Sequence, residues 1–185
     1  MRRVIPAPIL WLGIVAVTLS LPAAALATAG VGDQVAQVRA STARFHDNVT
    51  PEELEPRLAE AGYGPLHMCT DEETGLGAMG QHYVNGSLLG DATFDLSNPE
   101  VLVYEPTPNG RMRLVAVEFV ELVQAWPGSS PPELFGRQLR LVPFPNRYGV
   151  PAFYQIHVWL WKDNPAGMFS DWNERVSCLG MGDPQ

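Results

Sequence analysis

Apolar residues fill or alternate along several short segments of the chain, a pattern typical of β-strands. The clearest pair is 101–104 and 112–122, separated by a turn that contains Asn109-Gly110. An Asn-Gly pair between two apolar runs indicates a β-hairpin. Weaker strand patterns occupy 81–84, 137–142 and 152–161. Together these segments predict a mainly antiparallel sheet.

Two segments ahead of these strands carry apolar residues at helical spacing, over 34–46 and 50–62. The apolar positions are Val35, Val38, Thr42 and Phe45 in the first, and Leu54, Leu58 and Ala61 in the second. Thr50 and Glu53 form a capping-box sequence at the start of the second helix. Pro56 lies inside it, which predicts a short or bent helix.

The remaining segments are predicted as loops, including 64–80 and the proline- and serine-containing 126–136. Helices followed by strands define the α+β class. We therefore expect N-terminal helices packed on a mainly antiparallel β-sheet, with one disulfide, in a single domain over 28–185.

The N-terminus has the features of a secretory signal peptide. A basic start at Met1-Arg2-Arg3 precedes an apolar run over 9–21, and Ala25-Leu26-Ala27 matches a cleavage sequence. This predicts a signal peptide over 1–27 and a secreted or periplasmic mature chain. An uncleaved anchor is the alternative, since the apolar run approaches the length that spans a bilayer.

The charge of the predicted mature chain limits its partners. Removing Arg2 and Arg3 leaves 10 of the 12 basic residues against 20 acidic ones, a net charge of −10. Such a surface repels nucleic-acid phosphates and anionic lipids. We therefore expect no nucleic-acid partner and no membrane association after signal cleavage.

Cys69 and Cys178 are the only cysteines. A pair of cysteines in an exported chain predicts a disulfide, which would join the C-terminal segment to the region before the sheet. Two free thiols, available as metal ligands, are the alternative.

Three polar residues stand inside apolar strand patterns: His82, Glu118 and His157. Strand alternation places His157 on one face with Phe153, Gln155, Trp159 and Trp161. A carboxylate among apolar residues has to be paired, protonated or bound to metal. Two imidazoles and a carboxylate match a two-histidine, one-carboxylate transition-metal site. The alternatives are a structural hydrogen-bond network, or an edge position at which Glu118 faces solvent.

Two further sets of residues suggest weaker hypotheses. A copper(I) site could use soft ligands from 67–69 together with Met79 and Met168. The aromatic residues near the C-terminus could line a ligand pocket, although core packing is the preferred interpretation. This aromatic set is Phe153, Tyr154, Trp159, Trp161 and Trp172.

A literal G-x-G-x-x-G stands at 75–80. The dinucleotide-binding form of this motif follows a strand and opens a helix, whereas here an acidic loop precedes it and a strand pattern follows. We therefore reject a nucleotide cofactor and expect the glycines to let a tight loop pass close to the sheet.

Four segments together resemble a group of uncharacterised exported bacterial proteins. The likeness spans about Ala40 to Cys178, and the segments are Ala78-Met79-Gly80-Gln81-His82-Tyr83-Val84-Asn85, Val101-Leu102-Val103-Tyr104-Glu105-Pro106, Leu114-Val115-Ala116-Val117-Glu118 and 157–165, which begins His157-Val158-Trp159. The resemblance implies no activity. It implies that His82, Glu105, Glu118 and His157 lie in shared signature segments, which favours a common site.

Three functions remain open from the sequence. The leading hypothesis is a non-enzymatic binding protein that holds a small ligand or metal near His82, Glu118 and His157. The second is a metal-dependent enzyme, with Glu105 or Glu118 as a base. The third is an envelope interaction protein without a small-molecule site.

Overall fold

The computed structural model describes residues 30–71 and 75–179, so the predicted signal peptide at 1–27 lies outside the described residues. The described chain begins with helix α1, a short 3-10 turn η2 and helix α2. Their bounds are Val31–Thr42, Ala43–Phe45 and Pro51–Glu60. No helix in the described ranges is long and apolar enough to cross a membrane.

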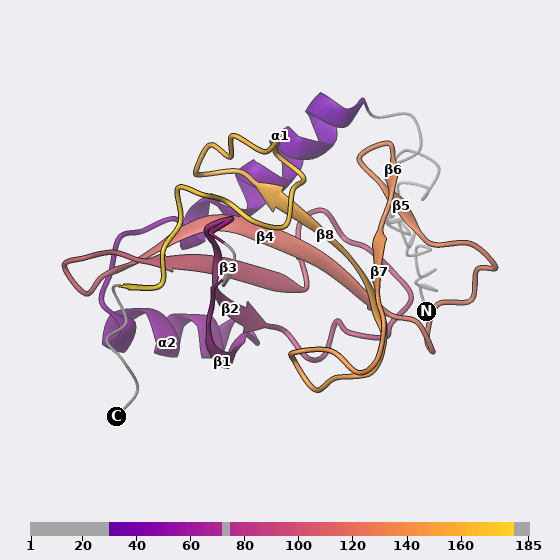
Figure 1. The fold of residues 1–185 in the computed structure, drawn as a ribbon, viewed down its shortest axis with the longest axis horizontal. Coiled ribbons are helices and arrows are strands. Elements are labelled where there is room, and N and C mark those ends of the chain that lie inside the picture. The colour runs from indigo at the N-terminus through magenta and orange to yellow at the C-terminus, as the bar shows by residue number, and fades with distance from the viewer. Residues whose placement is uncertain (1–29, 72–74, 180–185) are drawn as a thin grey trace, which may run out of the picture.

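In the described ranges, eight strands follow the helices. Their bounds are β1 Gly64–Asp71, β2 Ala78–Val84, β3 Val101–Pro106, β4 Met112–Leu122, β5 Glu133–Leu134, β6 Arg137–Gln138, β7 Arg140–Val142 and β8 Phe153–Trp159. Six of them form one sheet in the order β1-β2-β3-β4-β8-β7, in which every neighbouring pair is antiparallel (Figure 1). Strands β5 and β6 form a separate two-stranded hairpin.

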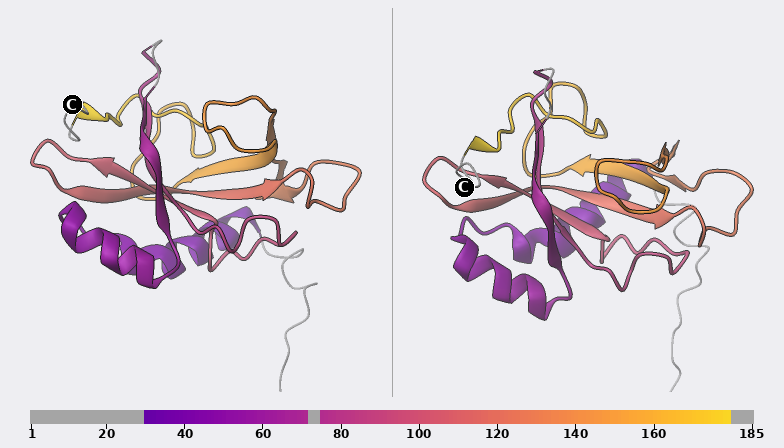
Figure 2. Two further views of the ribbon diagram at one scale, coloured as in Figure 1. Left: turned by 90° about the horizontal axis from the view of Figure 1, so that it is seen from below. Right: turned by 60° about the horizontal axis from the view of Figure 1, so that its bottom comes forward.

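The two faces of the sheet carry different buried clusters. One cluster joins Val38 of α1 and Leu54 of α2 to strand residues such as Tyr104 and Phe119. The other contains strand residues that point to the opposite face of the sheet, together with Val176 from the C-terminal segment. Among these strand residues are Val103, Ala116, Val120 and Trp159. Figure 2 shows both helices on one side of the sheet and the C-terminal segment on the other. The second face therefore has a cover made of loops and tail.

Helix α2 begins as its sequence predicts. The backbone N–H of Thr50 donates to the Glu53 carboxylate at 3.1 Å, and the capping box is complete. Pro56 lies inside a helix that nevertheless runs for 10 residues. A proline there removes one helical hydrogen bond, and burial of Leu54 and Leu58 on the apolar face offsets that loss.

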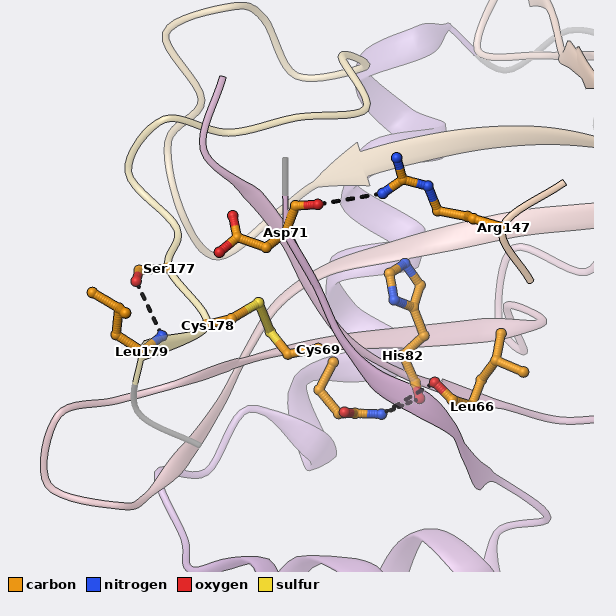
Figure 3. Close-up of a disulfide and its surroundings, with 9 residues drawn as sticks. Leu66, Cys69, Asp71, His82, Arg147, Ser177, Cys178 and Leu179 are labelled. Atoms are coloured by element: carbon orange, nitrogen blue, oxygen red, sulfur yellow. Dashed lines mark hydrogen bonds between the residues drawn. A yellow bond between two sulfur atoms is a disulfide. The ribbon is translucent and has the colours of Figure 1, made fainter. Parts of the chain in front are cut away.

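The Cys69–Cys178 disulfide is present, as predicted, and joins β1 to the C-terminal segment across 109 positions of sequence (Figure 3). The disulfide, the two helices and the mainly antiparallel sheet are thus confirmed. The hairpin of β3 and β4 also lies where the sequence predicts it, with its turn at Asn109-Gly110.

Three strand predictions need correction. The segment 64–80, predicted as a loop, holds β1 and the first residues of β2. The segment 137–142 divides into β6 and β7, which belong to different sheets. Strand β8 ends at Trp159 rather than 161, so Trp161 leaves the face of His157 and packs against the helix-side cluster.

Candidate metal centre

His82, Glu118 and His157 come from three strands, β2, β4 and β8, and meet on the face of the sheet opposite the helices. Glu118 and His157 stand directly opposite each other in the β4–β8 register. His82 pairs with Val103 of β3, which in turn pairs with Ala116, two residues before Glu118. Because side chains two apart on a strand share a face, the register brings all three together.

The three side chains are close to one another and removed from solvent. The Nε2 of His82 lies 3.5 Å from Glu118 Oε2, and the Nδ1 of His157 lies 2.8 Å from Glu118 Oε1. One ligand atom from each residue lies within 4.8 Å of the other two. The residues are 2%, 4% and 0% exposed in chain order. The edge position facing solvent, one alternative for Glu118, is therefore wrong.

Three ring nitrogens of this trio are buried without a hydrogen bond of good geometry among the described residues. They are both ring nitrogens of His82 and the Nε2 of His157, whereas His157 Nδ1 and Glu118 Oε1 form an ion pair at 2.8 Å. Buried polar groups are normally paired, so these unpartnered ring nitrogens make the trio a candidate for an added ligand.

The pKa values of the three residues shift in different directions in the folded protein. Burial lowers the pKa of His82 below its ordinary value, against a smaller opposing effect of Glu118. Burial also acts to lower the pKa of His157, but Glu118 and Asp171 outweigh it and raise that pKa to about 9. The two histidines together hold the pKa of Glu118 below its usual range despite burial. The protein alone thus holds a neutral imidazole, an imidazolium and a carboxylate.

Asp171, which sequence reasoning did not select, is the fourth polar group here. Its Oδ1 lies 3.6 Å from His157 Nδ1 and accepts a hydrogen bond from Gln155 at 3.3 Å, while Oδ2 pairs with Arg140 at 2.7 Å. Burial acts to raise its pKa, but His157 and Arg140 hold it below the ordinary value. Asp171 is in the irregular tail, where no local periodicity marks a residue as facing the sheet.

A cavity of about 80 Å³ adjoins the trio. His82 and Glu118 line it, whereas most of its wall is aliphatic, from residues such as Val84, Leu89 and Val120. Tyr148 forms another part of the wall: its ring lies 6.2 Å from that of His82, and its hydroxyl donates to Met79 Sδ at 3.4 Å.

The loop that carries Tyr148 is held in place by its neighbour in sequence. Arg147 donates from Nη1 to the backbone carbonyl of Asp71 at the end of β1, beside the segment that bears His82 (Figure 3). The cover over the trio is therefore built from the 143–150 loop and the C-terminal segment.

Glu105 lies apart from the trio. Its carboxylate pairs with Arg113 at 2.8 Å and contacts the ammonium of Lys162, the only lysine of the chain. These two cations occupy the carboxylate, so Glu105 is not available to the trio as a base.

The copper(I) hypothesis is weakened because the thiol of Cys69 is not available as a ligand. Cys69 is in the disulfide, Met79 accepts the Tyr148 hydroxyl, and Met168 is 39% exposed. The side chains of His67 and Met68 are outside what the structure describes.

The aromatic set does not form one pocket. Phe153 and Trp159 belong to the tail-side cluster, while Tyr154 and Trp161 pack against the helix-side cluster. Trp172 instead lies under the guanidinium of Arg147. Core packing, the preferred interpretation, accounts for Phe153 and Trp159.

The G-x-G-x-x-G segment leads into strand β2 rather than a helix, as expected from its context. Gly77 and Gly80 both have positive φ, 91° and 115°. A Cβ on Gly77 would lie 2.0 Å from the carbonyl oxygen of Asn173, and one on Gly80 would lie 2.5 Å from that of Tyr104. The glycines therefore permit close backbone approach.

Comparison with known protein families, with curated proteins and with solved structures finds no match to this chain. The functional argument therefore rests on the trio and its surroundings.

Proposed function

We propose that the protein is an exported binding protein that holds one divalent transition-metal ion between His82, Glu118 and His157. The observation that carries this proposal is the convergence of three buried ligand-type side chains within 4.8 Å, with no hydrogen bond of good geometry among the described residues to either ring nitrogen of His82. Imidazole and carboxylate donors suit Zn²⁺ and its first-row neighbours.

The spacing of the donors supports the same proposal. Zinc bonds of roughly 2.0–2.2 Å place tetrahedral donors roughly 3.3–3.6 Å apart. The His82–Glu118 contact at 3.5 Å lies within that range, whereas the His157–Glu118 contact at 2.8 Å is shorter and would have to widen. The ligand set as a whole lies within 4.8 Å, so side-chain adjustments of about 1 Å would close it around an ion.

A binding function is favoured over metal-dependent catalysis because the trio lacks a spare base. Glu118 is itself one of the three ligands, Glu105 is occupied by Arg113 and Lys162, and Asp171 pairs with Arg140. A hydrolytic or oxygen-activating site needs a group free to take up a proton beside the metal.

Export is part of the proposal. The 1–27 sequence and the likeness to exported bacterial proteins support it, and the Cys69–Cys178 disulfide is compatible with an oxidising compartment. Strand-borne ligands beneath a loop and a disulfide-linked tail suit retention of an ion outside the cell.

The test is elemental analysis of the tag-free mature protein after removal of metal and dialysis against Zn²⁺, Co²⁺, Mn²⁺ or Fe²⁺. We expect one equivalent in the wild type and none in His82→Gln/His157→Gln. The matched control is His46→Gln, because His46 stacks on Trp161 with ring centroids 4.0 Å apart and lies outside the trio.

Circular dichroism and a mass measurement of the intact disulfide establish that each variant is folded. Wild-type protein that stays empty with all four ions would refute the proposal. Equal loading of the double variant and the wild type would refute it as well, because the metal would then lie elsewhere.

A further inference from the structure

His157 has two carboxylates beside the same ring nitrogen. Its Nδ1 lies 2.8 Å from Glu118 Oε1 and 3.6 Å from Asp171 Oδ1. Its other ring nitrogen, Nε2, is buried and has no hydrogen bond of good geometry among the described residues. A histidine that binds a metal through one ring nitrogen almost always donates the N–H of the other to an oxygen such as that of a carboxylate. The ring of His157 is therefore oriented for an ion at Nε2.

Asp171 lies beside this histidine without belonging to the ligand group. It is not among the described residues whose ligand atoms lie within 4.8 Å of one another. Its Oδ1 accepts a hydrogen bond from Gln155 Nε2 at 3.3 Å, and its Oδ2 pairs with the half-exposed Arg140 at 2.7 Å. Gln155 is two residues before His157 on β8, so these two side chains share a face of the sheet. The carboxylate of Asp171 is thus held next to the His157 ring by contacts to both of its oxygens.

Metal binding changes which carboxylate can serve His157. In the structure, Glu118 is the nearer of the two. An ion that takes Glu118 as a ligand draws its oxygen away from Nδ1, and a buried N–H left without an acceptor is costly. Asp171 is the other carboxylate at that nitrogen. Closing its distance from 3.6 Å to the usual hydrogen-bond length of about 2.9 Å needs only a small side-chain movement.

We propose that Asp171 is a positioning residue of the metal site: it accepts the Nδ1–H of His157 and so holds the neutral ring with Nε2 toward the ion. This inference rests on the proposed metal-binding function. It assigns the coordinating atom of His157, and it gives a role to a carboxylate of the C-terminal segment that does not itself bind the metal.

The direct test is NMR spectroscopy of the ¹³C,¹⁵N-labelled mature protein, shown beforehand to hold one equivalent of Zn²⁺. Long-range ¹H–¹⁵N correlations within an imidazole ring distinguish a nitrogen that carries a proton from a nitrogen that binds zinc. We expect a protonated Nδ1 and a zinc-bound Nε2 for His157.

Variants of Asp171 measure its effect on affinity, by competition for Zn²⁺ with a chromophoric chelator. We expect Asp171→Ala to weaken Zn²⁺ binding about 10- to 100-fold, with one equivalent still bound at saturation and without the single protonation pattern of the His157 ring. Asp171→Asn keeps an acceptor oxygen at the same reach and should retain more of the affinity. The matched control is Asp163→Ala, which should bind as the wild type does, because Asp163 also follows β8 but is 80% exposed and pairs with Arg175.

The outcomes separate the two proposals. Protein that takes up no metal refutes the metal-binding function, and this inference fails with it. Zinc bound to His157 through Nδ1, or wild-type affinity in a folded Asp171→Ala variant, overturns only this inference. If Asp171→Ala does not fold, the spectrum of the zinc-loaded wild type alone decides the question.

Discussion

Two buried glutamates, Glu118 in β4 and Glu100 just before β3, show how a neighbouring charge decides the state of a carboxyl group. Glu118 and Glu100 are 4% and 1% exposed. The histidines beside Glu118 hold its pKa below the usual range. No cationic side chain of the described residues pairs with Glu100: burial raises its pKa to about 8, and it accepts the Val120 backbone N–H at 3.1 Å. Glu100 is therefore protonated in the folded protein at neutral pH, whereas Glu118 is ionised.

Glu100 makes stability fall as pH rises. Between its ordinary pKa of 4.5 and the folded value of about 8, the unfolded chain ionises while the folded protein keeps the proton, so rising pH favours unfolding. A tenfold difference in proton affinity between the two states corresponds to about 1.4 kcal/mol. We expect Glu100→Gln to remove this fall, so that the variant gains stability relative to the wild type by a few kcal/mol from pH 5 to pH 8.

Urea denaturation of both proteins at pH 5, 6.5 and 8 measures this difference. Taking the difference between the two proteins cancels groups that titrate alike in both. A gap between their free energies of unfolding that stays constant with pH would contradict the elevated pKa of Glu100.

The residues of the trio were recognisable from the sequence because each interrupts an apolar strand pattern. Their convergence was not, since it depends on the β2-β3-β4-β8 order and on the pairing of Glu118 with His157. Alternation predicts a face within one strand but not which strands are neighbours. Asp171 could not be identified from the sequence, because it lies in an irregular segment where no repeating pattern shows which way a side chain faces.

At the scale of elements, β1 and β2 show why a strand can escape detection. Strand β1 lies at the edge of the sheet, pairs on one side only, and contains Gly64 and Pro65 at its start. Proline is tolerated at such positions, although it lowers a strand's apparent propensity. The hairpin of β3 and β4 was predictable because its signals are local, whereas the β1–β2 pairing joins segments whose glycines indicated a loop.

At Gly80 in strand β2, we expect the addition of a single methyl group to lower the stability of the protein. It lies in β2, two residues before His82, with φ at 115°, and a Cβ there would lie 2.5 Å from the Tyr104 carbonyl oxygen. We expect Gly80→Ala to lower the free energy of unfolding by about 1–3 kcal/mol or more, from backbone strain and from β2–β3 separation. Metal affinity should fall with it, because His82 shifts.

Gly64→Ala is the control, since Gly64 is in β1 of the same sheet and a Cβ there meets no atom within 4 Å. Urea denaturation compares the stabilities, and competition with a chromophoric chelator compares the metal affinities. Equal stability of the two alanine variants would show that β2 accommodates a side chain at position 80.

At the scale of the whole molecule, the Cys69–Cys178 bond ties the edge strand to the segment that covers the trio. It closes a long loop, because the two cysteines are 109 positions apart in the sequence. In the chain-entropy view, a loop of this length restricts the unfolded chain by about 4–5 kcal/mol, and measured effects are often about 2–4 kcal/mol. The fold thus gains stability from a bond that touches neither helix.

We expect Cys69→Ser/Cys178→Ser to lower the free energy of unfolding by about 2–5 kcal/mol. Urea denaturation of the metal-free proteins measures the loss without any contribution from bound ions.

The tail also contacts the sheet through Asn173, whose backbone pairs with Ala78, so the variant should still fold and bind metal with unchanged stoichiometry. Its metal should exchange faster, because release needs the cover to open and the tail is no longer anchored at Cys178. Unchanged exchange of Co²⁺ for Zn²⁺ in a folded variant would mean that the ion leaves by a route that does not involve the tail.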